Sequence, residues 1–479
     1  MSGFRWTAGE VERALGSGPG GGDDDVVFSG VSTDTRTVAP GDLFVALKGE
    51  SFDAHHFLHA AARQGATGAV VSHVPPDGPA GIRWFEVPDT LQALGRLGRH
   101  RRRALAGRVV AVAGSNGKTT TKDLLRAALA PRYRVHATQG NLNNQVGVPL
   151  TLLAAPDDAE VVVVETGTNE PGEIAILGAM VEPDLALVTS IGEEHLEGLG
   201  SLAGVLDEEL AILPSIRGEG PAFVAEEPAE LPARARAAVG PARLRIAGVG
   251  AGADLRPDGG DDGVEVLPDG STRWGFRGVP VHLPLPGRHN VRNALLALGV
   301  AVELGVPVAD AARGIEAVSA PRMRSEWRRV GSLGVLADCY NANPPSTLAA
   351  VELLAALPAA GEKVAVLGTM REMGDHAPAL HRSVAAAVAA RVGRGIDRVV
   401  ATGDFVPAFA AHAQELGERL VLADDPLEAY ERLRPALRGD ETVLLKGSRG
   451  VALERLLPLL ERDFPARHEA DVSTAHAGA

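Results

Sequence analysis

The sequence predicts an α/β protein built from three domains. Its 479 residues exceed what one hydrophobic core usually contains, because chains beyond about 250–300 residues divide into domains. Short apolar runs rich in valine alternate with stretches of helical periodicity, an alternation typical of parallel sheets covered by helices. One such run leads through a glycine turn into a helix, and polar side chains follow several others. Those strand ends are the first candidates for a functional site, because ligands of parallel sheets bind there.

Residues 1–106 predict a small N-terminal α/β domain, with a flexible Gly- and Asp-rich stretch at 16–25. Short hydrogen-bonding side chains and two cations gather early in this domain: Ser32, Thr33, Asp34, Arg36 and Lys48. One interpretation is a site for an anionic, hydroxyl-rich ligand whose phosphates face the two cations. The other is a surface turn closed by a salt bridge, and the residues alone favour neither.

The central domain, residues 107–320, carries a phosphate-binding signature after the buried strand at 109–113. The signature consists of Gly114, Ser115, Asn116, Gly117, Lys118, Thr119 and Thr120. Backbone N–H groups and the helix N-terminus would face phosphates, Lys118 would add a charge, and Thr119 would offer a hydroxyl to Mg²⁺. The full signature has a glycine where Val112 stands, so an ordinary glycine-rich turn is the alternative. Gly-Lys-Thr directly after a buried strand favours the phosphate site, and predicts a parallel or mixed sheet of the P-loop ATPase type.

Further polar groups follow the next strands of this domain. Glu165 ends the valine run at 161–164, where an acidic residue beside a phosphate loop would hold Mg²⁺. His195 follows the predicted strand at 185–190, in position for a metal or a phosphate oxygen, although a lone loop histidine is more often structural. The loop before Glu165 contains Asn141, Asn143 and Asn144. This loop either contacts a ligand or is only a long connection.

The stretch 202–213 predicts an amphipathic helix with Glu209 inside its apolar stripe. Asp207 and Glu208 are expected to point away from that stripe. A carboxylate in an apolar stripe needs a cation or a metal, unless it lies at the helix edge and reaches solvent. Both alternatives remain open from the sequence.

Residues 221–285 predict strands and turns without evident chemistry, and a helix follows the segment 286–290. Asn290 and Asn293 lie one turn apart on that helix and share a face. Helix capping and ligand contact are both consistent with them.

Residues 321–463 alternate strand and helix, which predicts a Rossmann-like, doubly wound C-terminal domain. Polar groups again follow the strands: Asp338, Tyr340, Asn341, Asn343, Lys446, Ser448 and Arg449. The run 368–374, which contains Arg371 and Glu372, follows a further strand. They are expected at the ligand-binding edge of the sheet. Residues 464–479 are mostly polar or alanine and predict a disordered tail.

Composition indicates a soluble cytoplasmic protein. The net charge of −14 argues against nucleic-acid or acidic-membrane surfaces, and the basic cluster at 99–103 is best interpreted as a solvated helix end. Cys339 is the single cysteine, so an internal disulfide cannot form, as expected in a reducing compartment. Glu10 and Glu12 interrupt any signal-peptide pattern, and no uncharged apolar run approaches a membrane-spanning length.

Taken together, the motifs resemble the Mur ligase family from about residue 32 to 460. The specific resemblance lies in the asparagine loop at 143–144, the segments 286–290 and 338–344, and Lys-Gly-Ser-Arg at 446–449. It implies an ATP-dependent ligase that uses Mg²⁺ and joins D-alanyl-D-alanine to UDP-N-acetylmuramoyl-tripeptide through an acyl phosphate. ADP and phosphate would be released, in peptidoglycan precursor synthesis. The implied partners are small molecules, and a monomer is expected.

The resemblance also implies residue roles. Lys118 and Arg324 would stabilise the moving phosphoryl group, Thr119 and Glu165 would hold one Mg²⁺, and His195 would help hold a second. Beyond the loop 114–120, nucleotide contacts would come from Asn290, Asn293 and Asp338. The UDP substrate would be bound by Ser32, Thr33, Asp34, Arg36, Lys48, Asn141, Asn143 and Asn144. The acceptor would lie near Tyr340, Asn341, Asn343, Lys446, Ser448 and Arg449.

One position departs from the family pattern. The family usually places a carbamylated lysine where Glu209 stands, and no lysine occurs between Lys122 and Lys363. We hypothesise that the Glu209 carboxylate replaces the carbamate as a metal-supporting anion. The competing view is a damaged site in a weak enzyme. Two other functions also remain open: a ligase with another acceptor, and a nucleotide-binding module that ligates nothing.

Overall fold

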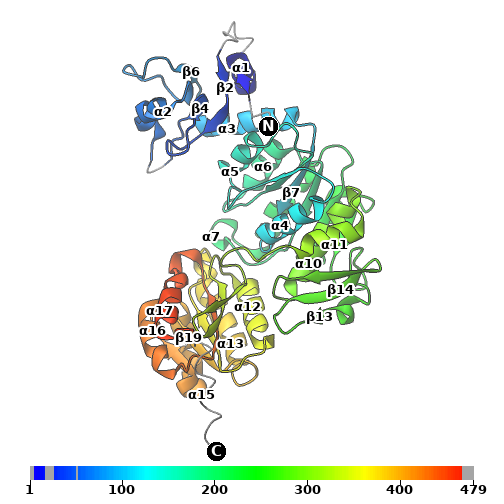
Figure 1. Cartoon of the computed structure of the whole chain (residues 1–479), viewed down its shortest axis with the longest axis vertical. Helices are drawn as coiled ribbons and strands as arrows, with labels where there is room; N and C mark the ends of the chain where they lie inside the picture. Colours follow the sequence, from blue (N-terminus) through cyan, green and yellow to red (C-terminus); the bar gives the residue numbers. More distant parts are fainter. Residues whose placement is uncertain (1–4, 17–25, 50–51, 467–479) are drawn as a thin grey trace, which may run out of the picture.

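The computed structural model describes residues 5–16, 26–49 and 52–466. The molecule is elongated, and its sheets form three successive regions from the N-terminus to the C-terminus (Figure 1). Residues 17–25 of the predicted flexible stretch lie outside the described residues, as do residues 467–479 of the predicted tail. No helix of the described residues is both long enough and apolar enough to cross a membrane.

The N-terminal region is built on a four-stranded parallel sheet of order β3-β4-β5-β6. Its strands are β3 (Gly30–Ser32), β4 (Asp42–Val45), β5 (Gly68–Val71) and β6 (Arg83–Glu86). A second, two-stranded sheet pairs β1 (Trp6–Thr7) with β2 (Val27–Phe28). The helices are α1 (Ala8–Leu15) and α2 (Leu58–Gln64).

Helix α3 (Thr90–Ala104) joins this region to the central one and packs against α5 (Gly147–Leu153) and α6 (Glu173–Val181). The basic cluster lies at its C-terminal end, and the prediction that this helix end is solvated holds for Arg99 and Arg103, which are exposed, but is wrong for Arg101 and Arg102. Arg102 is 1% exposed and donates to the Val181 carbonyl and to the Asp184 carboxylate, 2.9 Å away. Burial was not visible in the sequence because these acceptors lie about 80 residues further along the chain.

The central sheet has six parallel strands in the order β12-β11-β10-β7-β9-β8. The strands are β7 (Arg108–Ala113), β8 (Val135–Ala137), β9 (Val161–Glu165), β10 (Leu185–Val188), β11 (Ala222–Ala225) and β12 (Leu244–Ala247). Alternate residues of β7 face opposite layers, as expected of a strand buried on both sides. Val110 and Val112 pack toward α4 (Lys118–Leu129), α10 (His289–Glu303) and α11 (Val308–Glu316). Val109 and Ala111 pack toward α5, α6 and α8 (Leu202–Leu210).

The stretch 221–285 differs from its prediction, because it contains helix α9 (Glu230–Val239). The helical repeat is present in Leu231, Ala235 and Val239, which are all buried. Small side chains and proline at 232 made that repeat too weak to recognise. The expected strands follow it as an antiparallel sheet of β13 (Glu265–Val266), β14 (Thr272–Phe276) and β15 (Val279–Leu283).

The C-terminal sheet has the order β16-β17-β21-β18-β19-β20, with only β16 antiparallel. The strands are β16 (Glu326–Val330), β17 (Leu333–Asp338), β18 (Lys363–Leu367), β19 (Arg398–Ala401), β20 (Leu420–Leu422) and β21 (Thr442–Lys446). One face packs against α12 (Pro344–Ala356), α13 (Ala377–Ala389) and α14 (Phe405–Phe409). The other packs against α16 (Pro426–Leu433) and α17 (Leu457–Asp463), as a doubly wound fold requires. Two short helices, α7 (Leu196–Leu199) and α15 (Ala413–Leu416), complete the chain.

Candidate active site

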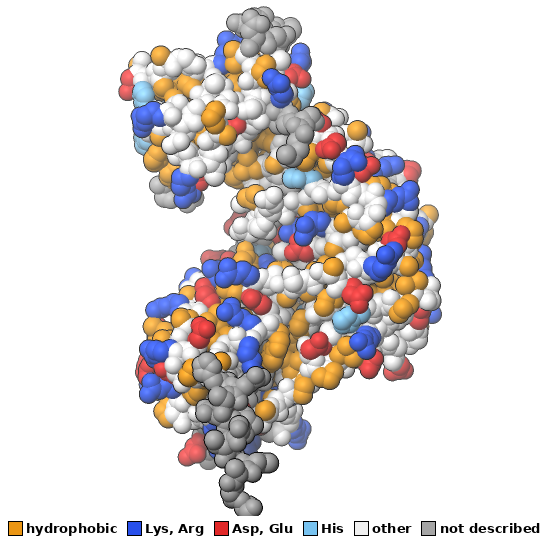
Figure 2. Space-filling view, viewed as in Figure 1, with side chains coloured by type: hydrophobic (Ala, Val, Ile, Leu, Met, Phe, Trp, Pro, Cys, Tyr) orange, Lys and Arg blue, Asp and Glu red, His pale blue; other side chains and the backbone are white. Residues whose placement is uncertain are grey.

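A cavity of about 1150 Å³ lies between the central and C-terminal regions. The phosphate loop, the ends of β9 and β10 and the start of α10 form one wall, and the loops after β17, β18 and β21 form the other. The outline of the whole molecule is also indented between its N-terminal and C-terminal parts (Figure 2). The predicted strand ends of two separate sheets therefore face one another across a shared space.

The phosphate loop needs glycine at two of its positions. Gly114 has a φ of +118°, and a Cβ there would lie 2.4 Å from the Thr189 hydroxyl. Gly117 has a φ of +85°, and a Cβ there would lie 2.6 Å from Oδ1 of Asn293. A side chain at either position would meet both backbone strain and a collision. The shortened signature thus has the tight backbone that a phosphate cradle requires.

Lys118 folds back over this loop. Its Nζ donates to the carbonyls of Gly114 and Ser115, and lies 3.6 Å from the carboxylate of Glu194. Burial opposes the charged form of Lys118, but nearby carboxylates, above all Glu194, outweigh it and raise the Lys118 pKa. Burial raises the pKa of Glu194, which the charge of Lys118 opposes. The cation at the loop is therefore maintained by a buried carboxylate that the sequence did not single out.

Glu165 stands at the predicted end of β9 and is 2% exposed. Its Oε1 accepts hydrogen bonds from Asn143 Nδ2 at 2.9 Å and from the Thr119 hydroxyl at 3.3 Å. Its Oε2 is buried without a hydrogen-bond partner among the described residues. A buried carboxylate oxygen without a partner, beside a hydroxyl, has the chemistry that Mg²⁺ prefers.

The predicted metal residues do not all converge. Within the described ranges, no group of three or more His, Cys, Asp or Glu side chains is arranged to hold a metal ion. A Mg²⁺ ion bound mainly by phosphates and water needs only one or two protein oxygens, so Glu165 and Thr119 fit such an ion.

His195 connects the two walls of the cavity. Its Nδ1 lies 2.6 Å from Glu372 Oε2 on the C-terminal side, and its Nε2 lies 4.0 Å from Glu194. Burial lowers the His195 pKa, but Glu372 and Glu194 outweigh this and raise it. Both His195 and Glu372 have positive φ angles, +49° and +66°. The pair holds two residues in a backbone conformation that costs about 1–3 kcal/mol each.

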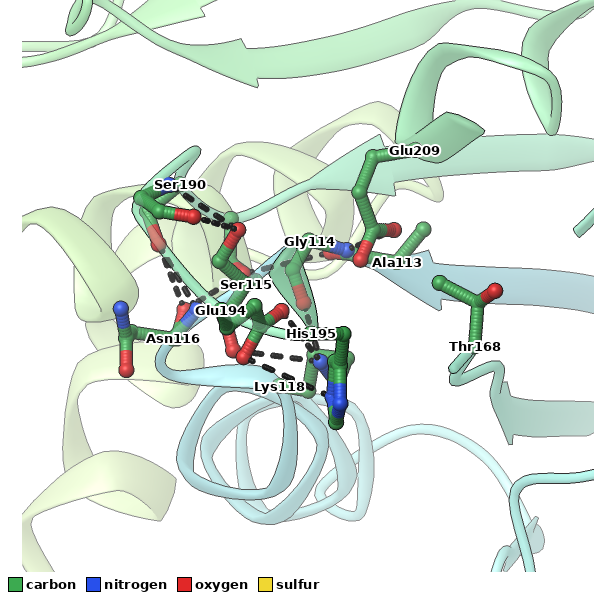
Figure 3. A network of polar contacts seen from close by, with 12 residues as sticks. Ala113, Gly114, Ser115, Asn116, Lys118, Thr168, Ser190, Glu194, His195 and Glu209 are labelled. Carbon is green, nitrogen blue, oxygen red and sulfur yellow. Dashed lines mark hydrogen bonds and ion pairs between the residues drawn. The ribbon is translucent and has the colours of Figure 1, made fainter. Parts of the chain in front are cut away.

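Glu209 is fully buried, so the interpretation of a helix-edge residue reaching solvent is excluded. Its Oε2 accepts a hydrogen bond from the Gly114 backbone N–H at 2.6 Å, and its Oε1 has no partner among the described residues. Burial raises the Glu209 pKa to about 7, against the opposing effect of Lys118. The Glu209 carboxylate points toward the Gly114 backbone of the loop (Figure 3). Glu209 is not among the residues that line the cavity.

The expectation that Glu208 points away from the protein is wrong. Its carboxylate accepts hydrogen bonds from the backbone N–H groups of Gly172 and Ile174, both at 2.7 Å, at the start of α6. A negative charge there satisfies N–H groups that have no partner within helix α6. Helical periodicity could not show this, because α8 is covered by another element on that side as well.

The asparagines predicted around the nucleotide lie at the cavity. Asn290 donates to the Pro286 carbonyl at 2.8 Å and accepts from Asn293 at 3.0 Å, so both side chains are fixed beside Gly117. Asn141, Asn143 and Asn144 also line the cavity. Asn144 in addition accepts from the N–H groups of Val146 and Gly147 at the start of α5.

The predicted acceptor residues line the opposite wall, with the exception of Asn343. Asn343 caps α12 and donates to Asn116 of the phosphate loop at 2.9 Å, which ties the two walls together. Lys446 is 2% exposed and its Nζ lies 2.9 Å from Asp338 and from the Asn341 carbonyl. The Arg324 guanidinium stacks on Tyr340, 4.2 Å from the ring centroid.

The N-terminal candidates lie elsewhere. Ser32, Thr33, Asp34, Arg36 and Lys48 do not line the cavity. Arg36 donates to both carboxylate oxygens of Asp34, so the salt bridge of the second interpretation is present, and Arg36 holds the pKa of Asp34 down at about 2. Its guanidinium is 86% exposed and remains open to a ligand.

Several cavity residues were given no role from the sequence: Glu194, Glu227, Arg292, Arg371 and Glu372. Glu194, Arg371 and Glu372 lie in the runs 193–195 and 368–374, which follow predicted strands, but strand-end position alone did not separate them from their neighbours. Arg292 pairs with Glu227 at 2.9 Å, a contact that no local pattern indicates.

Each of the three regions matches a family model of the Mur ligases. Residues 27–102 match the model described as the Mur ligase family, catalytic domain, residues 112–301 match the Mur ligase middle domain, and residues 323–449 match the Mur ligase, glutamate ligase domain. The chain belongs to the Mur ligase family.

Its relatives are more specific. The UDP-N-acetylmuramoyl-tripeptide–D-alanyl-D-alanine ligase of Bacillus subtilis is 34% identical over 91% of this chain and 93% of its own length. The ligase of that name from Escherichia coli is 35% identical over 92% and 95%. The crystal structure of MurF from Acinetobacter baumannii superposes with a TM-score of 0.83 at 32% identity, covering 96% of this chain and 99% of that one. A MurF ligase from Thermotoga maritima in complex with ADP gives 0.76 at 27% identity, covering 91% and 97%.

Proposed function

We infer that this chain is an ATP-dependent amide ligase that joins D-alanyl-D-alanine to UDP-N-acetylmuramoyl-tripeptide in peptidoglycan precursor synthesis. Relatives of that name match nearly its whole length. The observation that carries the proposal is the single cavity lined by both the phosphate loop and the C-terminal strand ends. A ligase must bring an activated carboxyl group and an incoming amine together. In this cavity the wall with the phosphate loop would bind the activated carboxyl group, and the C-terminal wall would bind the amine substrate.

The reaction proceeds in two steps. The terminal carboxylate of the tripeptide attacks the γ-phosphorus of ATP, the bond to the β-phosphate oxygen breaks, and ADP leaves. The free amine of the dipeptide then attacks the acyl carbon, the C–N bond forms, the C–O bond to phosphate breaks, and the amine's proton leaves with the phosphate. The loop N–H groups, Lys118 and Arg324 neutralise charge on the moving phosphoryl group. Enclosure between the two walls protects the acyl phosphate from water.

The proposed reaction also uses Mg²⁺. Thr119 and Glu165 would be the protein ligands of one ion, and His195 would help hold a second. Bound Mg²⁺ would neutralise phosphate charge during transfer. Its support is the oxygen of Glu165 that has no partner and the adjacent Thr119 hydroxyl. Glu209 would act behind the loop as the anion that replaces a carbamylated lysine, with one carboxylate oxygen on Gly114 and one without a partner.

The N-terminal residues 32–36 and 48 are proposed to bind the UDP end of the substrate, with Asn141, Asn143 and Asn144 closer to its tripeptide. The proposed domain boundaries remain 1–106, 107–320 and 321–463, and the first falls between the end of α3 at Ala104 and the start of β7 at Arg108. We also expect a cytoplasmic protein and a monomer; the mass in solution would test the monomer, and cell fractionation the location.

The experiment is a phosphate-release assay with purified protein, ATP and Mg²⁺. We expect release only when UDP-tripeptide and D-alanyl-D-alanine are both present, with the ligated product confirmed by mass spectrometry. Release with another amino acid or dipeptide instead would establish a different acceptor. Tight ATP binding without turnover on any acceptor would overturn the ligase assignment.

A further inference from the structure

The cations that line the cavity differ in whether a carboxylate neutralises them. They are Lys118, Arg292, Arg324, Arg371, Lys446 and Arg449. Four have carboxylate partners at 2.9–3.6 Å, in the pairs Lys118–Glu194, Arg292–Glu227, Lys446–Asp338 and Arg449–Glu454. Within the described ranges, Arg324 and Arg371 form no such pair. The proposed reaction gives Arg324 a phosphoryl group. Arg371 is left without a carboxylate in contact, because the adjacent Glu372 carboxylate contacts His195 instead.

Arg371 is nevertheless held in place. Its Nη2 donates to the Gly450 carbonyl at 3.1 Å, and its backbone N–H donates to the Ser448 hydroxyl at 2.9 Å. A Cβ at position 450 would lie 2.2 Å from Nη1 and 2.4 Å from Cζ of Arg371. The guanidinium therefore occupies the space that the absent side chain of Gly450 leaves, while most of its five N–H donors remain free.

Contacts along the cavity wall connect Arg371 to the phosphate loop. The next residue, Glu372, contacts His195 at 2.6 Å, and His195 lies beside Glu194, the partner of Lys118. In the proposed reaction the dipeptide amine must reach the acyl carbon near Lys118, and its carboxylate then points away from it. Two extended residues span at most about 7 Å, so the carboxylate must be bound on the wall close to the loop.

We propose that Arg371, positioned by Gly450, binds the C-terminal carboxylate of the acceptor dipeptide. This proposal rests on the proposed function and adds the residue that recognises the acceptor's charged end. A planar guanidinium with free paired donors matches a carboxylate in two parallel hydrogen bonds. Arg449, which the sequence suggested for the acceptor, is already engaged by Glu454 at 2.9 Å.

The test combines a change of residue 371 with a change of the acceptor's C-terminal carboxylate. KM is measured for D-alanyl-D-alanine and for its C-terminal amide, with wild type and with Arg371→Ala. Wild type should prefer the dipeptide over the amide by roughly 10–100-fold, as a charged hydrogen bond provides. Arg371→Ala should raise KM for the dipeptide by that factor and leave KM for the amide, for ATP and for UDP-tripeptide nearly unchanged. Arg382→Ala, an exposed arginine of α13 outside the cavity, is the control.

Gly450→Ala is the independent arm. Gly450 is not in the left-handed region, so alanine adds no backbone strain, and its Cβ would displace the end of a flexible side chain. It should raise KM for the dipeptide as Arg371→Ala does, and the double variant should show no further rise. An equal rise for dipeptide and amide, or a rise for ATP or UDP-tripeptide instead, overturns the proposal. Wild type without ligase activity would overturn the proposed function itself.

Discussion

Replacing Glu209 separates two roles that this side chain combines. Glu209→Gln keeps the shape and one oxygen that can accept the Gly114 N–H, but removes the charge. Glu209→Ala removes both. If the carboxylate supports the metal in place of a carbamate, both variants must lose activity, whereas only the alanine variant must lose stability.

The magnitudes follow from the contacts. Alanine leaves the buried Gly114 N–H without a partner, which costs about 1–3 kcal/mol. It also deletes one buried methylene, at roughly 0.8 kcal/mol. The sum is about 2–4 kcal/mol, or a fall in Tm on the order of 10 °C for a unit of this size. Glutamine should stay within about 1 kcal/mol of wild type, while kcat/KM falls roughly 10–100-fold in both variants, as removing an outer metal-supporting group does.

The assay combines thermal unfolding with steady-state phosphate release, measured over a range of UDP-tripeptide concentrations at saturating ATP and dipeptide. Wild-type turnover is also measured in CO₂-free buffer with and without added bicarbonate, and should not respond, because a carboxylate needs no carbamylation. Full activity in Glu209→Gln would refute the need for a charge at this position. Activity that is lost without CO₂ and restored by bicarbonate would refute the replacement of the carbamate.

The remaining predictions concern the phosphate loop, the partly buried His289 of the cavity wall and the buried Cys339. Gly117→Ala should weaken ATP binding more than tenfold by calorimetry, whereas Gly172→Ala, with a similar φ of +90° but open space around it, should leave binding unchanged. Burial lowers the pKa of His289 to about 4; Asp338 opposes this shift, and Arg292 and Lys446 add to it. As the pH falls, His289 is therefore protonated in the unfolded chain before it is protonated in the folded one. The free energy of unfolding should therefore be highest above pH 6.5 and decrease by up to about 3 kcal/mol toward pH 4. In urea titrations, His289→Gln should make the free energy of unfolding less dependent on pH in this range. Burial raises the pKa of the Cys339 thiol to about 12, so the native protein should show no fast-reacting thiol and one after denaturation; a fast native reaction would contradict its burial.

The parts that the sequence predicted well are those whose causes are local. The phosphate loop is a contiguous stretch, and its two left-handed glycines follow from one turn. The valine runs of β7 and β9 predicted buried parallel strands because both faces of such strands must be apolar. The three-domain α/β fold class was confirmed by these elements and by MurF structures that match nearly the whole chain.

The parts that were missed depend on which surfaces meet. Arg102 and Glu208 looked solvent-facing, yet Arg102 binds Val181 and Asp184, and Glu208 caps α6. No local periodicity encodes those acceptors, because they belong to other elements. The same holds for Arg371, whose position depends on a missing side chain at Gly450.

Contacts between the two walls of the cavity hold the phosphate loop against the C-terminal strand ends, whereas the proposed UDP site lies outside the cavity. His195 forms an ion pair with Glu372, and Asn343 donates to Asn116, so the loop and the C-terminal strand ends are joined by direct contacts. ATP and a dipeptide are short, and the γ-phosphate and the amine must both reach the tripeptide's carboxyl group within this joined space. UDP-N-acetylmuramoyl-tripeptide is long, and the carboxylate to be activated lies at the opposite end from its uridine. A UDP site at residues 32–36 and 48, outside the cavity wall, is therefore consistent with one substrate that extends from the N-terminal region to Lys118.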